Sequence, residues 1–167
     1  LDLAQVSHVK AGDHPTDVNM IVDEVVRELT LNKEDAPEII AEKLPQTWIP
    51  ETLVYQIFIN LLSNANHYVA KESGAIEVGS WDENKSTTYF VRDYGSGVPA
   101  KERETIFDIF FRGKRSKGKR GTGVGLAIVR KIALRCQGQA WVEQTPGGGA
   151  TFCISLPKAP AFGVDLN

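Results

Sequence analysis

The sequence predicts an α/β (α+β) two-layer sandwich with helices packed on one face of a mixed sheet. Amphipathic helical stretches alternate with pairs of strand-like runs, and a long glycine-rich loop precedes the last helix. The 167-residue chain fits one domain that can bury a sizeable core. Its 42% hydrophobic and 24% charged content is ordinary for a globular protein, and its net charge of −2 excludes polyanion binding by bulk charge.

Apolar periodicity defines the elements in the first half of the chain. Residues 1–12 carry a helical pattern that is too short to be stable alone, so we interpret it as the end of a longer element. Asp17 can cap a helix whose apolar face consists of Val18, Ile21, Val22, Val25, Val26 and Leu29. Short strands are expected over residues 38–44 and 46–49. A long helix is expected over residues 50–71, because proline suits its first position.

The second half is expected to form two hairpins separated by a loop and a helix. The hairpin strands are residues 75–82 with 86–93, and 139–144 with 150–156. Residues 94–123 are rich in glycine, with only 101–110 expected to be helical, and a loop this long is usually functional. Helical periodicity returns over residues 124–136, and residues 157–167 are expected to be a disordered tail.

Cysteine usage and hydropathy limit the class of protein. Cys136 and Cys153 lie in apolar stretches without metal-ligand spacing, which favours buried thiols over the alternative of a disulfide. No apolar run approaches the roughly 18 residues that a membrane span needs, and no signal peptide opens the chain. We therefore expect a cytoplasmic location without membrane contact by this chain, whether or not a parent protein is anchored in a membrane.

Asn60, Asn64 and Tyr68 are the first candidate site residues. A spacing of four places them on the same side of the expected long helix. A half-buried carboxamide needs partners, and its oxygen suits a hard cation such as Mg²⁺, which keeps waters and substrate phosphates as its other ligands. The alternative is that the asparagines cap nearby backbone or face solvent.

Two glycine-containing motifs are further candidates. Residues 93–97 (Asp-Tyr-Gly-Ser-Gly) end an expected strand, where the aspartate can accept a hydrogen bond from an amine; the alternative is an ordinary turn. Residues 121–126 (Gly-Thr-Gly-Val-Gly-Leu) run into a helix whose first amides can bind an anion; the alternative is a flexible hinge. No Gly-Lys-Ser/Thr follows, which excludes a P-loop, and no strand leads directly into the motif, which argues against a dinucleotide fingerprint.

A basic stretch without acidic residues lies between these motifs. It contains Arg112, Lys114, Arg115, Lys117, Lys119 and Arg120. It is interpreted as a solvated loop, a phosphate lid or a nucleic-acid patch. The aromatic interleaving of single-strand-binding proteins is absent, because Phe110 and Phe111 adjoin the stretch on one side only.

In their order along the chain, these motifs resemble the boxes of the GHKL ATPase superfamily, and within it those of sensor histidine kinases. The similar segments are 60–65 (asparagine box), 93–97 (first glycine box), 106–112 (phenylalanine box), 121–129 (second glycine box) and 147–152 (the last hairpin). The resemblance covers residues 13–157 and implies a Bergerat-type fold with a mainly antiparallel sheet.

The resemblance also implies roles in binding ATP and Mg²⁺. Asn64 coordinates Mg²⁺, and Asn60 assists at the metal or the phosphates. Asp93 accepts a hydrogen bond from the adenine amino group, Tyr68 stacks near the base, and His67 faces the phosphates. The glycine boxes let the chain pass the nucleotide and supply amides to its phosphates; their residues are Gly95, Gly97, Gly121, Thr122, Gly123, Val124, Gly125 and Leu126.

Residues 96–121 correspond to the ATP lid of the family. Its anchors on the body of the domain are Phe107, Phe110 and Phe111. Arg112 is the candidate catalytic residue of this segment, reaching the γ-phosphate or the partner domain.

Two positions bear on the chemistry that the resemblance implies. Members of the superfamily that hydrolyse ATP carry glutamate where Asn60 stands, and asparagine cannot take up a proton at neutral pH. This favours transfer of the phosphoryl group to a histidine over hydrolysis. The family often carries lysine at the position of His67, and histidine there can serve only as a donor with a weaker charge.

The resemblance implies a partner that carries the phosphoacceptor. Residues 1–12 resemble the end of a second dimerisation helix, residues 13–157 the catalytic domain, and residues 158–167 a flexible tail. The acceptor histidine belongs on a first dimerisation helix, so His8 and His14 are poor candidates, and we expect the isolated chain to bind ATP without autophosphorylation. A homodimeric parent and a response regulator are implied.

Three other functions fit parts of the same pattern. They are a degenerate nucleotide-binding module that signals without transfer, a sigma-factor-regulating serine kinase of the same fold, and nucleic-acid binding through the basic stretch. The intact boxes argue against the first and the dimerisation-helix remnant against the second. No nucleic-acid partner is expected.

Overall fold

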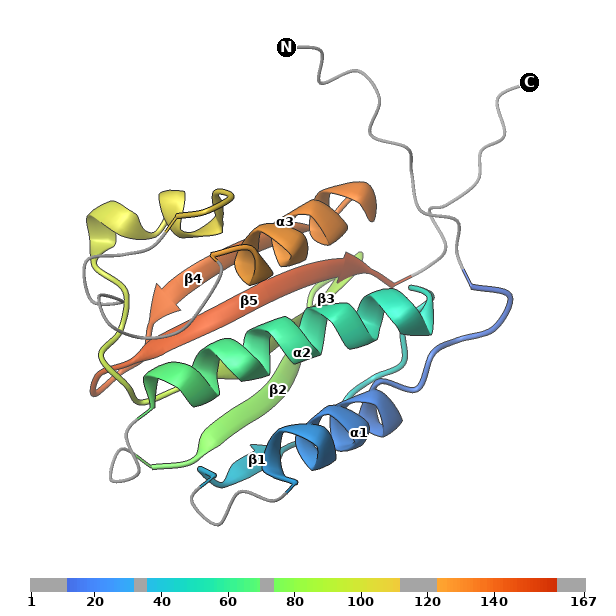
Figure 1. Cartoon of the computed structure of the whole chain (residues 1–167). Helices are drawn as coiled ribbons and strands as arrows, with labels where there is room; N and C mark the ends of the chain where they lie inside the picture. The colour runs from blue at the N-terminus through green and yellow to red at the C-terminus, as the bar shows by residue number, and fades with distance from the viewer. Residues whose placement is uncertain (1–11, 32–35, 70–73, 112–122, 159–167) are drawn as a thin grey trace.

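The computed structural model describes residues 12–31, 36–69, 74–111 and 123–158 (Figure 1). Its α-helices are α1 (Val18–Thr30), α2 (Glu51–Tyr68) and α3 (Gly125–Arg135). Its strands are β1 (Ile39–Ala41), β2 (Ile76–Asp82), β3 (Ser86–Arg92), β4 (Gln139–Gln144) and β5 (Ala150–Pro157). Two 3₁₀ turns, η2 (Ala100–Glu102) and η3 (Thr105–Phe107), lie between β3 and α3.

The strands form one mixed sheet in the order β1-β2-β3-β5-β4. β1 pairs with β2 in parallel, and all other neighbours are antiparallel. All three helices lie on the same face of this sheet (Figure 1). The predicted two-layer sandwich with a mixed, mainly antiparallel sheet is therefore confirmed.

The core lies between the helices and the sheet. Ile57, Leu61 and Ala65 lie on one side of α2 and are buried, whereas Leu53 and Tyr68, toward the ends of the helix, are only partly buried. Phe58 on the same helix meets the ring of Tyr89 of β3 edge-on at 6.2 Å. Such contacts hold α2 at the centre of the helical layer and fix where its polar residues lie.

The other face of the sheet carries aromatic side chains instead of helices. The ring of Trp81 lies 5.5 Å from that of Phe90 and 6.5 Å from that of Trp141. The Arg92 guanidinium stacks over Phe90 at 4.9 Å. We call this surface the open face.

Several predicted boundaries are confirmed and others are wrong. Asp17 caps α1 as predicted, since its carboxylate accepts the Asn19 N–H at 3.0 Å. The strand predicted over 38–44 is only β1, and residues 46–49 form no strand beyond a single bridge between Thr47 and Thr16. Pro45 between them cannot donate to a ladder, and its carbonyl accepts instead from Tyr89 Oη at 3.0 Å.

The helix predicted over residues 101–110 is wrong. Only the two 3₁₀ turns form there, because Phe107 is the one fully buried side chain of the segment and a single anchor provides no apolar stripe for a longer helix. The helix predicted over 50–71 ends at Tyr68, and residues 70–73 lie outside the described part. None of the helices in the described ranges is both long and apolar enough to cross a membrane.

Candidate functional site

The Asp93 carboxylate lies directly after β3 and is only 2% exposed. Its Oδ1 accepts the backbone N–H of Gly95 at 2.9 Å and of Ala150 at 3.2 Å. No hydrogen bond from the described residues reaches Oδ2. Burial raises the pKa of this carboxyl, and the two backbone hydrogen bonds counteract that shift only in part. The arrangement leaves one carboxylate oxygen able to accept a hydrogen bond from a ligand.

Close backbone approaches surround Asp93 at glycines. A Cβ at Gly95 would lie 2.7 Å from the Tyr68 carbonyl oxygen, so the motif after β3 contacts the end of α2. Gly149 has φ +103°, and a Cβ there would collide with the Asp93 carbonyl. Gly97, with φ +69°, lies against Gly149 in turn. The structure thus brings Tyr68, Gly95 and Gly97 together with Asp93. The part of Gly149 was missed, although the run of three glycines could have indicated it.

Asn60 on α2 faces the first residue of α3. A Cβ at Gly125 would lie 2.7 Å from Asn60 Oδ1, so only glycine fits without moving the carboxamide. Asn60 Nδ2 donates to the Gln56 carbonyl at 2.6 Å, which points Oδ1 toward α3. The two motifs, far apart in sequence, therefore meet.

The first backbone amides of α3 donate to no capping side chain among the described residues. Val124 is its N-cap residue and supplies no side-chain hydrogen bond to them, so an anion can take that place. Gly123 has φ +69°, and its carbonyl accepts the Phe110 N–H at 3.0 Å. The Leu126 side chain packs against the core, which leaves only its backbone for a ligand. Gly121, Thr122 and Arg112 lie outside the described residues.

Asn64 and His67 complete the polar side of α2. The half-buried Asn64 carboxamide makes no hydrogen bond to any described residue. His67 is exposed, and its ring lies 5.6 Å from that of Tyr68. The described residues contain no cluster of three or more His, Cys, Asp or Glu side chains that could hold a metal. A cation here would rely on carboxamide oxygens and on a ligand's own oxygens, which is the donor set that Mg²⁺ accepts.

The expected anchors between β3 and α3 differ from one another. Phe107 is 4% exposed and meets Phe152 at 6.4 Å, as expected of an anchor. Phe110 is 75% exposed with φ +64°, so its expected anchoring role is wrong. The Phe110 backbone N–H donates to the Gly123 carbonyl, and the side chain of Phe110 projects outward. Phe111 is half-buried.

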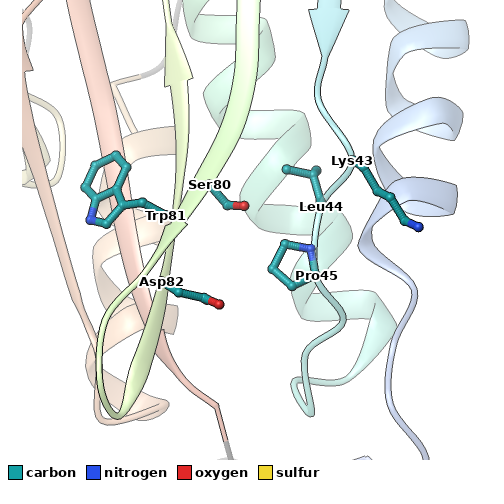
Figure 2. Close-up of a pocket in the computed structure, with 6 residues that line it drawn as sticks. All are labelled: Lys43, Leu44, Pro45, Ser80, Trp81 and Asp82. Carbon is teal, nitrogen blue, oxygen red and sulfur yellow. The ribbon is translucent and has the colours of Figure 1, made fainter.

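A separate cavity of about 360 Å³ lies between the end of β2 and the segment that follows β1, at the other end of the strands from Asp93 (Figure 2). It is lined by Lys43, Leu44, Pro45, Ser80, Trp81 and Asp82. The antiparallel register places the end of β2 beside the start of β3, away from Asp93. None of the predicted site residues lines this cavity, so it forms no part of the candidate site.

The two predicted cysteine thiols are buried and unpaired, as expected. Burial raises the pKa of Cys136 to about 11 and that of Cys153 to about 12. Neither thiol therefore contributes a thiolate to the site at neutral pH.

Comparisons with known proteins show the family to which the chain belongs. Residues 50–160 match the family model described as "Histidine kinase-, DNA gyrase B-, and HSP90-like ATPase". The adaptive-response sensory kinase SasA of Nostoc sp. is 32% identical over 151 residues, which are 87% of this chain and 37% of SasA. The chain therefore spans less than two-fifths of that relative.

Solved structures give the same result. The catalytic domain of histidine kinase ThkA superimposes with a TM-score of 0.72 and 28% identity, covering 88% of this chain and 98% of that domain. Full-length ShkA in complex with AMPPNP superimposes with a TM-score of 0.76 and 25% identity, covering 96% of this chain and 34% of ShkA. This chain belongs to the family of histidine kinase-, DNA gyrase B- and HSP90-like (GHKL) ATPases and is an ATP-binding domain of its histidine kinase branch.

Proposed function

We propose that this chain binds Mg-ATP and donates the γ-phosphate to a histidine on a separate dimerisation domain in two-component signal transduction. The observation that carries the proposal is the meeting of Asn60 with the uncapped start of α3, on the same side of the sheet where Asp93 is buried. ATP needs these three chemistries together: a base acceptor, an anion site and oxygen ligands for a cation.

The adenine end of the site is formed around Asp93. Its free Oδ2 accepts the exocyclic amine, while Gly95 and Gly97 keep side chains out of the base's path. Tyr68 lies beside this position at the end of α2. Guanine carries an oxygen where adenine carries the amine, and that oxygen would face the carboxylate unfavourably. We therefore expect preference for ATP over GTP.

The phosphate end is formed by α2 and α3. The first amides of α3 stabilise the phosphates electrostatically. Asn64 is the proposed Mg²⁺ ligand, because its carboxamide is unbonded among the described residues, and Asn60 assists from one turn earlier. When bound, Mg²⁺ neutralises phosphate charge that develops during transfer. His67, Gly123, Val124, Gly125 and Leu126 are the proposed remaining contacts.

Transfer rather than hydrolysis follows from the chemistry of Asn60. A carboxamide cannot accept a proton from water, so this position supplies no general base. The chain's part is to hold the γ-phosphate while an imidazole nitrogen of the partner attacks its phosphorus. The bond between this phosphorus and the oxygen that bridges the β- and γ-phosphates breaks, and ADP leaves with that oxygen. Arg112 is proposed to stabilise this step.

The partners of the chain are proposed from the same assignment. They are the dimerisation and phosphoacceptor domain of a homodimeric parent, and a response regulator that takes the phosphoryl group from the histidine. A cytoplasmic site of action follows, since ATP and the regulator are found there.

Phosphate transfer is tested with γ-labelled ATP. We expect no stable phosphohistidine on the isolated chain, and an acid-labile label on the parent's dimerisation domain when that domain is added. An acid-stable label on serine would indicate a serine kinase instead. Binding of ATP without label on any added domain would indicate a nucleotide-binding module.

Asn64→Ala tests the metal site. ATP binding is measured by calorimetry with and without Mg²⁺. We expect Mg²⁺ to strengthen ATP binding to the wild type by about tenfold or more, the size of one charge-assisted contact, and to have little effect on the variant. Gln56→Ala removes an exposed amide from the same helix and serves as the control. Equal Mg²⁺ dependence in the wild type and Asn64→Ala would refute the assignment.

A further inference from the structure

A series of hydrogen bonds leads from side chains on the open face of the sheet to the backbone carbonyl of Asp93. The buried Thr145 hydroxyl donates to the Asp93 carbonyl at 3.0 Å, and its oxygen lies 3.0 Å from that of Thr151. Because the one proton of Thr145 is used on the carbonyl, Thr151 must be the donor between the two hydroxyls. The Thr151 oxygen in turn accepts Arg92 Nε–H at 3.4 Å. Every donor in this series therefore points toward Asp93.

Glu77 of β2 anchors both neighbours of Asp93. Its Oε2 accepts from Arg92 Nη1 at 3.0 Å, and its Oε1 accepts from the Tyr94 hydroxyl at 2.9 Å. Successive side chains of a strand point to opposite faces of the sheet. Because Arg92 and Tyr94 are both held by Glu77 on the open face, Asp93 between them points to the helical side. Stacking of Arg92 on Phe90 holds the same guanidinium from a third direction.

We propose that Thr145 and Glu77 are positioning residues for the base-recognising carboxylate of Asp93. This inference rests on the proposed function, in which Asp93 accepts the adenine amine. Thr145 fixes the carbonyl of residue 93 and Glu77 fixes the residues on either side of it, so together they set where Oδ2 lies. A site that selects by one hydrogen bond loses selectivity when its acceptor shifts, because the bond weakens steeply with distance and angle. Base selectivity is thereby determined in part from the open face of the sheet.

The test compares the affinities for Mg-ATP and Mg-GTP by calorimetry in Thr145→Val, Thr145→Ser and Glu77→Gln. Loss of one hydrogen bond corresponds to about fivefold in affinity, so we expect Thr145→Val to lower the ATP-to-GTP preference by about that factor. Thr145→Ser keeps the hydroxyl and should restore the preference. Glu77→Gln, at a side chain that is 35% exposed, should lower it without endangering the fold.

Thr88→Val is the control for buried threonine hydroxyls. Thr88 lies on β3 with 0% exposure, and its hydroxyl has no hydrogen-bond partner among the described residues. This variant should keep the full ATP preference. If Thr145→Val folds, its preference decides; if it does not, that of Glu77→Gln does. If the deciding variant keeps the ATP-to-GTP preference while Asp93→Asn abolishes it, this inference is overturned and the proposed function stands. A wild-type chain without ATP binding or ATP preference would overturn the proposed function and this inference with it.

Discussion

At the scale of single residues, the buried carboxylate of Asp93, our proposed base-recognising group, opposes stability. Its carboxylate is buried, and no ion pair from the described residues compensates its charge. Two backbone donors satisfy one oxygen, and the other is left for a ligand. A buried carboxylate without a cation is retained at a cost, which is the expected pattern at a binding site.

Asp93→Asn should therefore stabilise the unliganded chain while it abolishes ATP preference. The pKa of Asp93 is higher in the folded than in the unfolded chain, so ionisation of this carboxyl destabilises the fold. This loss of stability is absent below the unfolded pKa and grows with pH until the pH has passed the folded pKa. Denaturant unfolding of both proteins should show the variant more stable at pH 8, with the difference closing as the pH falls. A variant less stable than the wild type at pH 8 would contradict this account.

At the scale of elements, the contact between α2 and α3 shapes the proposed phosphate end of the site. Gly125 begins α3, although glycine is among the poorest helix formers. The space beside Asn60 Oδ1 excludes a methyl group at this position unless the carboxamide moves. Glycine is thus required by the site and not by the helix.

Gly125→Ala should weaken Mg-ATP binding with little loss of thermal stability. The methyl group would displace the end of the Asn60 side chain, which can rotate away, and so disturb the phosphate and metal contacts while the helix persists. Calorimetry and thermal unfolding measure the two effects. Gly147→Ala makes a control for glycine loss outside the site, because no atom lies near its Cβ position; its positive φ of +88° should reduce stability and leave affinity unchanged.

Prediction from sequence succeeded for elements with strong local signals. β4 has the predicted bounds, α1 begins at its predicted cap, and α3 differs by one residue at each end. The predictions that were wrong concern segments in which neither an apolar helical stripe nor a turn motif specifies the local structure. Residues 101–110 carry apolar side chains that only tertiary packing sorts into a buried Phe107 and an exposed Phe110.

At the scale of the whole molecule, the two buried thiols lie in different places: Cys136 belongs to the core between the helices and the sheet, whereas Cys153 is on the open face, paired with Phe90 and Trp141. Cys136 ends the helical layer after α3, and Cys153 lies in the middle of β5; both are buried and have raised pKa values. A single domain of this size is expected to unfold as one unit.

Both thiols should therefore react with Ellman's reagent at pH 8 only on global unfolding. We expect negligible labelling of the native chain, two labelled thiols in denaturant, and equal labelling rates for the two single-cysteine variants at low denaturant. Faster labelling of Cys136→Ala than of Cys153→Ala, or the reverse, would show that helical layer and sheet open separately.

The sequence by itself determined the elements, their order and the residue types of the candidate site, because periodicity, caps and glycine motifs are local properties. It did not determine which of these residues meet. Only the tertiary structure placed Asn60 against Gly125, turned Phe110 outward and backed Asp93 with Thr145, 52 residues away. Such contacts depend on how the sheet register and the helical layer close over the same core, and no short stretch of sequence carries that information.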